Sequence, residues 1–217
     1  MGNLSLIQTI AAWALPVLFA ITLHEVAHGW MAMKLGDRTA QMMGRLSLNP
    51  IKHIDPVGTL LIPCVLLAIG GFVFGWAKPV PVTWQNLNKP KTDMIWVALA
   101  GPAANLIMAI VWALFAKIGV MMVQAGNENM IALVYMGFAG MQINTILMLL
   151  NLLPLPPLDG GRILVGVLPG PLSWQVSRIE PYGFFILVGL LYFGVISMIL
   201  SPLMKGFIGL LSSTFGL

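Results

Sequence analysis

Two histidines and a glutamate lie within five residues near the start of the chain, in the sequence His24-Glu25-Val26-Ala27-His28. On an α-helix, positions i and i+4 lie on one face, so both imidazoles can reach the same metal ion. Glu25 projects about 100° around the helix from His24, close enough to contact a water on that ion. Two histidine ligands beside a glutamate base are typical of zinc hydrolase chemistry, so the pattern predicts a metal site.

A catalytic zinc site needs a third protein ligand and an open position for water. Asp159 is the strongest candidate among the seven carboxylates, because it directly follows a long apolar run. Prolines before it break the helix, and the two glycines after it allow a tight turn. The alternatives are that Asp159 caps a loop or pairs with Arg162, or that Asp55 or His53 supplies the third ligand.

The composition indicates the surroundings of this site. Hydrophobic residues make up 59% of the chain and charged residues 8%, against about a quarter charged in soluble proteins. This excludes a soluble enzyme, a disordered tail and a nucleic-acid reader, and predicts one integral membrane domain over residues 1–217 whose surroundings are the lipid bilayer. Each ionisable group at bilayer depth costs about 2.5 kcal/mol or more, so simple hydrogen bonding between helices is a poor explanation for three of them together.

Apolar runs of about 20 residues are long enough to cross a bilayer. We therefore expect an all-α polytopic protein with about four to five transmembrane helices, the first of them retained rather than cleaved as a signal peptide. The apolar runs cover residues 4–35, 57–76, 94–123, 130–153 and 181–201.

Two polar stretches separate the early runs. Residues 36–56 are rich in turn-forming residues and alternate in polarity, which predicts a short β-hairpin within residues 36–48. Prolines at positions 79, 81 and 90 exclude a helix in the second stretch, so residues 77–82 are expected to form an edge strand.

Three motifs together resemble the site-2 protease family of intramembrane zinc metalloproteases, in a compact form without PDZ or CBS domains. They are HEVAHGW near the start, GPAAN at the head of a middle helix, and NLLPLPPLDGGR at the end of a later one. The resemblance is clearest over residues 20–180. It implies one Zn²⁺ per chain, bound by His24, His28 and Asp159, with Glu25 as the base.

The resemblance also implies roles for residues near the metal. Asn151, eight residues before Asp159, would position the substrate or the developing oxyanion, and a hydrogen bond between helices is the alternative. His53 could assist in the same way, although a structural histidine in a turn is the simpler interpretation. Asn105 of GPAAN is expected to pack and hydrogen-bond, beside small residues that let helices approach closely.

The three ligands must meet at one depth, which constrains the topology. If the first four runs all crossed the membrane, the histidines and Asp159 would lie near opposite faces. Residues 57–76, with Pro63 and a Gly-Gly pair inside them, are therefore expected to be re-entrant. Positive charge then gathers on one side, which places the site nearer the cytoplasmic face, and the resemblance favours a prokaryotic plasma membrane. The expected cytoplasmic cations are Lys34, Arg38, Arg45, Lys52, Lys78, Lys89, Lys91, Arg162 and Arg178, with Lys117 and Lys205 opposite.

The implied reaction is hydrolysis of a peptide bond within or near a transmembrane segment of another membrane protein, as in regulated intramembrane proteolysis. The substrate would have to unwind, and residues 77–82 or the hairpin could bind it by β-augmentation. A small metal-ion transporter and a catalytically silent zinc-binding scaffold stay open as alternatives, although no inverted repeat is evident. A prenyl-protein-processing membrane protease would typically use a glutamate as third ligand, which the LDGG sequence disfavours.

Overall fold

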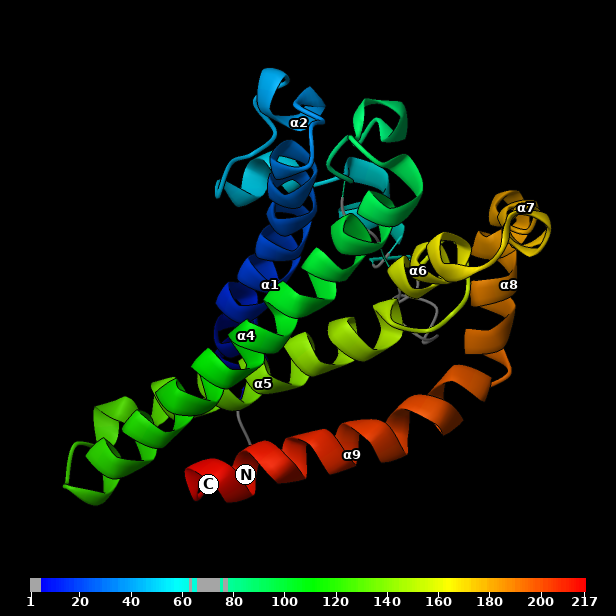
Figure 1. The fold of residues 1–217 in the computed structure, drawn as a ribbon. Coiled ribbons are helices and arrows are strands. Elements are labelled where there is room, and N and C mark those ends of the chain that lie inside the picture. The colour runs from blue at the N-terminus through cyan, green and yellow to red at the C-terminus, as the bar shows by residue number, and fades with distance from the viewer. Residues whose placement is uncertain (1–4, 63, 66–74, 76–77) are drawn as a thin grey trace.

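The structure is a computed structural model that describes residues 5–62, 64, 65, 75 and 78–217 (Figure 1). Every regular element in these ranges is helical, which confirms the expected all-α class. Four helical segments are long and apolar enough to cross a membrane, as an integral membrane protein requires. They are α1 (Leu6–Lys34), α4 (Pro90–Gln124), α5 (Ile131–Asn151, preceded by a short turn) and α9 (Val195–Phe215).

Shorter elements connect these helices. The α-helical ones are α2 (Thr39–Met42), α6 (Asp159–Val167), α7 (Gly170–Ser177) and α8 (Glu180–Tyr192). Single turns of other helix types occur at η1 (Pro50–His53), η2 (Pro56–Leu61), η3 (Trp84–Asn86) and η4 (Glu128–Met130).

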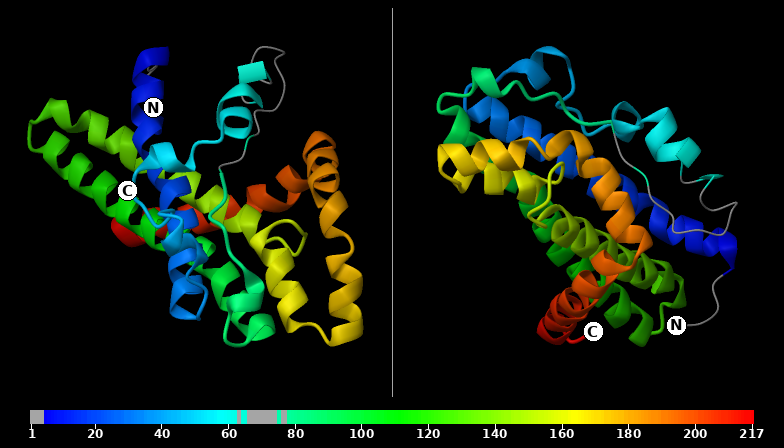
Figure 2. Two further views of the ribbon diagram at one scale, coloured as in Figure 1. Left: turned by 90° about the horizontal axis from the view of Figure 1, so that it is seen from above. Right: turned by 90° about the vertical axis from the view of Figure 1, so that its right-hand side faces the viewer.

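Helices α4 and α5 form the centre of the molecule and run side by side in both views of Figure 2. Glycines make this close approach possible. A Cβ on Gly140 would lie 2.1 Å from Trp112 Cγ, and one on Gly137 would lie 2.6 Å from Ala116 Cα. Packing of small residues drives helix association inside a membrane, where the hydrophobic effect between helices is absent.

The last apolar run does not form the single span over residues 181–201 that its hydropathy predicts. Helix α8 ends at Tyr192, and Gly194 adopts the left-handed conformation with φ of 74° before α9 begins. Glycine adopts this conformation without steric cost, so the chain can turn there. Helix α9 then continues to Phe215, beyond the predicted run, and lies along the lower edge of the molecule (Figure 1).

The predicted β-hairpin is wrong: residues 36–48 form α2 and turns, and no strand occurs among the described residues of either polar stretch. Asp37 gives the physical reason. Its buried carboxylate accepts hydrogen bonds from Thr39, from the Thr83 N–H and from the Asn86 side-chain amide, which hold the two stretches together without strand pairing. Burial alone would raise the pKa of Asp37, but these hydrogen bonds outweigh it and hold the pKa below its ordinary value.

The two polar stretches lie on the same side of the molecule, as the topology argument requires. The Asn88 N–H donates to the Leu35 carbonyl, and the Lys78 N–H donates to the His53 carbonyl. The chain between them must therefore leave and return on one side. Its expected re-entrant course stays a prediction, because residues 63, 66–74, 76 and 77 lie outside the described part of the chain.

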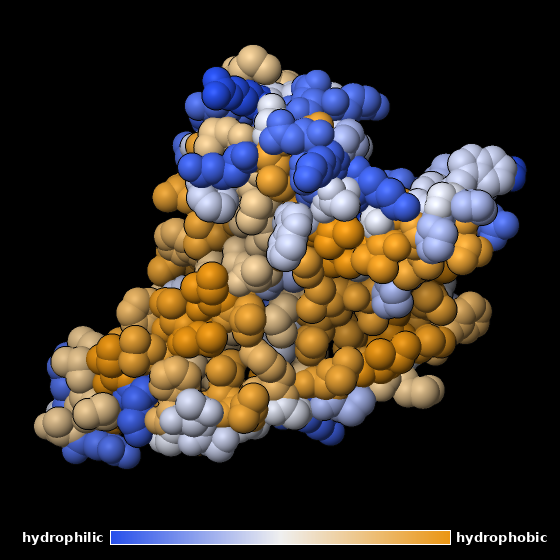
Figure 3. Space-filling model, in the orientation of Figure 1, coloured by the Kyte–Doolittle hydropathy of each residue, from blue (hydrophilic) through white to orange (hydrophobic). Residues whose placement is uncertain are grey.

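The surface hydropathy forms layers. Figure 3 shows a hydrophilic cap at the top, over α2 and the start of α4, and a broad hydrophobic band below it. Hydrophilic side chains return along the lower edge, where α9 runs. This sequence of layers is what a bilayer core between two aqueous interfaces requires.

Candidate metal centre

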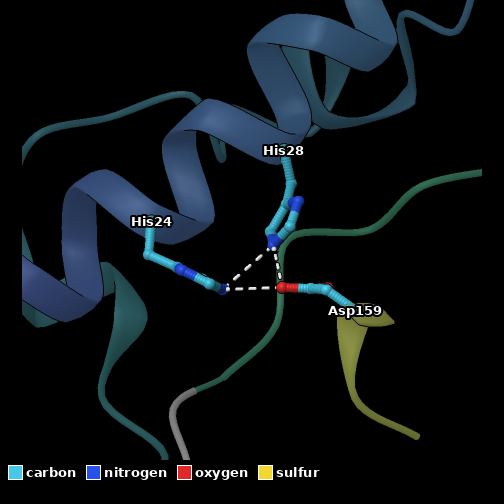
Figure 4. Close-up of side chains that lie close together, drawn as sticks. All are labelled: His24, His28 and Asp159. Atoms are coloured by element: carbon cyan, nitrogen blue, oxygen red, sulfur yellow. Dashed lines mark hydrogen bonds and ion pairs between the residues drawn. The ribbon is translucent and has the colours of Figure 1, made fainter. Parts of the chain in front are cut away.

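The two motif histidines lie one turn apart on α1 and point into the protein (Figure 4). His24 is 8% exposed and His28 is 9% exposed. Because i and i+4 side chains share a helix face, their rings can converge on one point. Their Nε2 atoms lie 3.0 Å apart, as the spacing of the motif predicts.

Asp159 reaches the same point from a distant part of the sequence. Helix α5 ends at Asn151, the prolines that follow prevent its continuation, and Asp159 opens α6. A Cβ on Gly160 would lie 2.3 Å from the Leu153 carbonyl oxygen, so only glycine fits where the chain turns back. This turn brings Asp159 Oδ2 to 3.3 Å from His24 Nε2 and 3.3 Å from His28 Nε2.

The other ring nitrogen of each histidine is engaged by a group that fixes its proton. His28 Nδ1 lies 2.7 Å from the Val97 carbonyl, which can only accept, so His28 donates from Nδ1. His24 Nδ1 lies 2.6 Å from Asn105 Oδ1. The Asn105 amide nitrogen donates to the Ala20 carbonyl and to Asn144 Oδ1, so its oxygen is the acceptor for His24.

With the proton held at Nδ1, each ring in its neutral form presents an Nε2 lone pair to the centre. Asp159 Oδ2 is buried and has no hydrogen-bond partner among the described residues, although it lies within ion-pair distance of both rings. Three electron-pair donors thus face one another at 3.0–3.3 Å. A cation between them resolves this repulsion.

The spacing fits zinc. Zinc bonds to histidine nitrogen and carboxylate oxygen of about 2.0–2.1 Å give tetrahedral edges of about 3.3–3.4 Å. The edges of the observed triangle are 3.0, 3.3 and 3.3 Å. Three protein ligands leave the fourth tetrahedral position open, as in hydrolytic zinc sites and unlike structural ones.

Helix α4 packs directly against the rings. A Cβ on Gly101 would lie 2.4 Å from His28 Nε2 and 2.6 Å from His24 Cε1. Gly101 of the GPAAN segment has no side chain and so leaves room for the two rings. Asn105 of the same segment is the hydrogen-bond partner of His24. Asn105 does hydrogen-bond in the core, as expected, and its partners include a predicted site residue.

A cleft of about 170 Å³ opens beside the triangle. Glu25 lies at its edge, half-buried, and its Oε2 accepts the Val80 N–H over 2.8 Å. Residues 78–83 pass along the cleft without helix or turn, visible as the green trace beside the three side chains in Figure 4. The cleft is thus bounded by the residue expected to be the base and by the segment expected to be a strand.

The remaining predicted site residues differ in their positions relative to the cleft. Asn151 lines the cleft, and its amide donates to the Leu147 carbonyl within its own helix, so the alternative of a bond between helices does not apply. His53 is buried, does not line the cleft and donates to the Ser47 carbonyl. Arg162 is 3.9 Å from Glu180 and stacks over the Trp84 ring, whereas Asp159 faces the histidines.

Two residues at the site were not anticipated. Asn144 is fully buried and completes the chain of hydrogen bonds from Asn105 to α5. An asparagine in an apolar span, two turns before Asn151, is a signal that could have found it. The Val80 N–H leaves no trace in the sequence, because any residue but proline has this group.

Comparisons with known proteins give matches over most of the chain. The profile of peptidase family M50 matches residues 12–124 and 117–191. The chain is 38% identical over 194 residues to YwhC of Bacillus subtilis, named as a zinc metalloprotease, a match that covers 87% of this chain and 84% of that protein.

More distant relatives carry similar names. Rip2 of Mycolicibacterium smegmatis, also named as a zinc metalloprotease, is 32% identical over 85% of this chain and 66% of its own length. The protease RseP of Yersinia pestis is 29% identical over 52% of this chain and 26% of its own length. No solved structure matches the chain.

Proposed function

Because the chain belongs to peptidase family M50, the site-2 protease family, we propose that it is a zinc-dependent intramembrane protease. It would hydrolyse a peptide bond within or near a transmembrane segment of another membrane protein. The observation that carries this proposal is the buried triangle of His24 Nε2, His28 Nε2 and Asp159 Oδ2. These three atoms would bind the single zinc ion.

The roles of the chain's own residues follow from their positions. A zinc ion held there would polarise the scissile carbonyl and lower the pKa of a water molecule toward about 7. Glu25 would take the proton of the attacking water at its carboxylate and deliver it to the leaving nitrogen. Asn105 and the Val97 carbonyl keep the two rings in the tautomer that the ligands need. Asn151 has amide capacity left to contact the substrate carbonyl across the cleft.

The segment over residues 78–83 is suited to hold an unwound substrate. In an extended chain, the N–H and C=O of one residue point to the same side, and the next residue points to the other side. The Pro79 carbonyl accepts from Arg45 and the Thr83 N–H donates to Asp37, so these two residues anchor the segment to the protein. Lys78, at the start of the segment, is anchored as well, because its carbonyl also accepts from Arg45. Val80, whose N–H points to Glu25, and Val82 form the other set.

This second set faces the cleft and is largely free. Both valines line the cleft, and within the described ranges Val82 makes no backbone hydrogen bond. A peptide in the cleft could therefore add to this edge as a strand, with Pro81 between the two valines on the anchored side. The proposed β-augmentation needs only one free edge, so it does not depend on the predicted hairpin.

The layered surface suggests the orientation. The hydrophilic cap over α2 and the start of α4 carries the basic loop residues, so the positive-inside rule places it in the cytoplasm. The two histidines of the metal triangle lie in the half of α1 that leads to this cap. The site would then open nearer the cytoplasmic face of a bacterial plasma membrane, since the named relatives come from bacteria.

The decisive experiment separates metal binding from catalysis. We would express wild type, Glu25→Gln and Asp159→Ala in bacterial membranes, measure zinc per purified chain, and map new protein termini within transmembrane segments. Glu25→Gln should keep one zinc per chain and lose at least about 100-fold in cleavage, as general-base loss predicts. Asp159→Ala should lose zinc and cleavage together.

Glu128→Gln is the matched control, because Glu128 lies in the α4–α5 connection away from the cleft. It should change neither zinc content nor cleavage. Cleavage that survives in Glu25→Gln would exclude the proposed base. A zinc-loaded wild type that produces no cleavage would favour a scaffold or transporter. A well-folded wild type that binds no zinc would remove the basis of the proposal.

A further inference from the structure

A groove of about 470 Å³ lies between α5 and α9, apart from the metal site. Its polar lining is unusual for a surface at the edge of the apolar band. It consists of one lysine, two serines and a glutamine beside apolar walls: Lys205, Ser201, Ser212, Gln142, Met204 and Ile208.

Three polar residues of α9 form one stripe, whereas Ser213 and Thr214 near its end lie outside it. Positions 201, 205 and 212 recur at helical spacing and so lie on one side of the helix. Apolar side chains on another side, Ile196, Leu200 and Leu211, are buried against the protein. On the side opposite Lys205, exposed apolar side chains remain: Ile199, Leu203 and Leu210.

This three-sided pattern suits a helix that lies in a membrane interface. Its exposed apolar side would enter the acyl region while its polar stripe faces the headgroups. Figure 1 shows α9 along the lower edge of the molecule, and the view from above in Figure 2 shows it crossing the directions of α4 and α5. The Lys117 ammonium donates to the Gly216 carbonyl and fixes the end of α9 to α4 in this position.

The positive charge of Lys205 would attract an anion. No carboxylate lines the groove, and among the described residues the side chains of Lys205, Ser201 and Gln142 have no hydrogen-bond partner. A cation at a membrane boundary is stabilised by an anionic lipid headgroup by about 1 kcal/mol. A phosphate oxygen accepts from an ammonium, a hydroxyl and an amide alike, and these are the donors that the groove offers.

We propose that the groove between α5 and α9 binds the phosphate of an anionic phospholipid, with Lys205 as the charged contact and Ser201, Ser212 and Gln142 as hydrogen-bond donors. The acyl chains would lie along the apolar side of α9. The bound lipid would hold α9 in the interfacial plane of the leaflet opposite the hydrophilic cap. This inference does not depend on proteolysis, because no groove residue contributes to the metal triangle.

The test uses the full chain in mild detergent, titrated with phosphatidylglycerol or phosphatidylcholine and followed by native mass spectrometry. The first phosphatidylglycerol should bind about fivefold more tightly than phosphatidylcholine, the ratio that about 1 kcal/mol gives. Lys205→Gln should abolish this preference, Lys205→Arg should retain it, and Gln142→Leu should reduce affinity for both lipids.

Lys52→Gln is the matched control, since Lys52 is an exposed lysine of the opposite polar stretch, and it should keep the preference. Size-exclusion behaviour and zinc content check that each variant is folded. Equal binding of the two lipids by wild type, or a preference that persists in Lys205→Gln, would overturn the proposal. Displacement of phosphatidylglycerol by millimolar inorganic phosphate would assign the groove to free phosphate and overturn the lipid assignment.

Discussion

At the residue scale, the candidate metal centre depends on polar contacts to the ring nitrogens that face away from the centre. His24 and His28 each use one ring nitrogen to contact α4, through Asn105 and the Val97 carbonyl. Removing such a contact from a metal-binding histidine typically costs 10–100-fold in metal affinity. The proposed ligands and the groups that contact them come from α1, α4 and α6, so no single segment contains the candidate site.

Gly101 gives a sharp test of this arrangement. A methyl group there would lie 2.4 Å from His28 Nε2, so Gly101→Ala should push the rings apart and lower zinc affinity by about tenfold or more. Competition with a chelator measures the affinity, and circular dichroism checks that the helices remain. Gly189→Ala is the matched control, because nothing lies within 4 Å of that position. Unchanged zinc affinity in Gly101→Ala would show that the rings do not need this surface.

The sequence could predict the local part of the site. The spacing of His24 and His28 alone requires that their side chains share a helix face, and the structure shows that they do. Asp159 was chosen because few carboxylates follow an apolar run, together with the family resemblance. Asn144 and the Val80 N–H escaped prediction because their importance comes from contacts 39 and 55 residues away along the chain.

At the element scale, the segment over residues 78–83 has two edges with different tasks. One edge is bound to Arg45 and Asp37, and the other faces Glu25 and the cleft. The segment was expected to be a strand, but a strand needs a partner and none is present among the described residues. Its side-chain anchors keep it in place without one.

Removing a backbone donor from the free edge tests its role. Val82→Pro should impair cleavage of membrane proteins by about tenfold or more, with zinc content unchanged, because proline has no N–H to offer. Val80→Pro should impair cleavage as well, but it also removes the hydrogen bond to Glu25. Val80→Thr keeps both the N–H and the shape of the side chain and is the control. Full cleavage by both proline variants would rule out β-augmentation at this edge.

Helix boundaries could be predicted where the composition changes along the chain. Where the composition stays the same, the prediction of the boundary failed. Helices α1, α4 and α5 begin and end close to the limits of their apolar runs. Hydropathy continues across Phe193 and Gly194, so it could not reveal that the chain turns there into α9. The break depends on one glycine in a left-handed conformation, and many glycines in membrane helices stay helical.

At the scale of the whole molecule, two hydrophilic boundaries enclose one apolar band (Figure 3). The composition predicted the band, and the basic loops predicted which boundary faces the cytoplasm. The crosswise position of α9 was not predictable, because its length and hydropathy equally fit a span. Helix α9 packs against α5 and α4, and its interfacial position is part of our proposal for the groove.

The orientation can be measured with single cysteines. The lone native cysteine, Cys64, is exposed and would first be replaced by serine. In intact bacterial cells, a membrane-impermeant maleimide should label Asn127→Cys, in the loop between α4 and α5. It should label Lys52→Cys only after the membrane is permeabilised. Labelling of both positions from the outside would contradict a cytoplasmic cap.

The contacts behind the two histidines also bear on how the protein is made. Asn105 and the Val97 carbonyl both belong to α4, and they orient the rings through protein groups alone. We therefore expect folding in the bilayer to precede metal binding, unlike that of a zinc finger, which folds only around its ion. Metal delivery becomes a late maturation step, so membranes from zinc-starved cells should contain intact, dormant enzyme that added zinc restores without new protein synthesis.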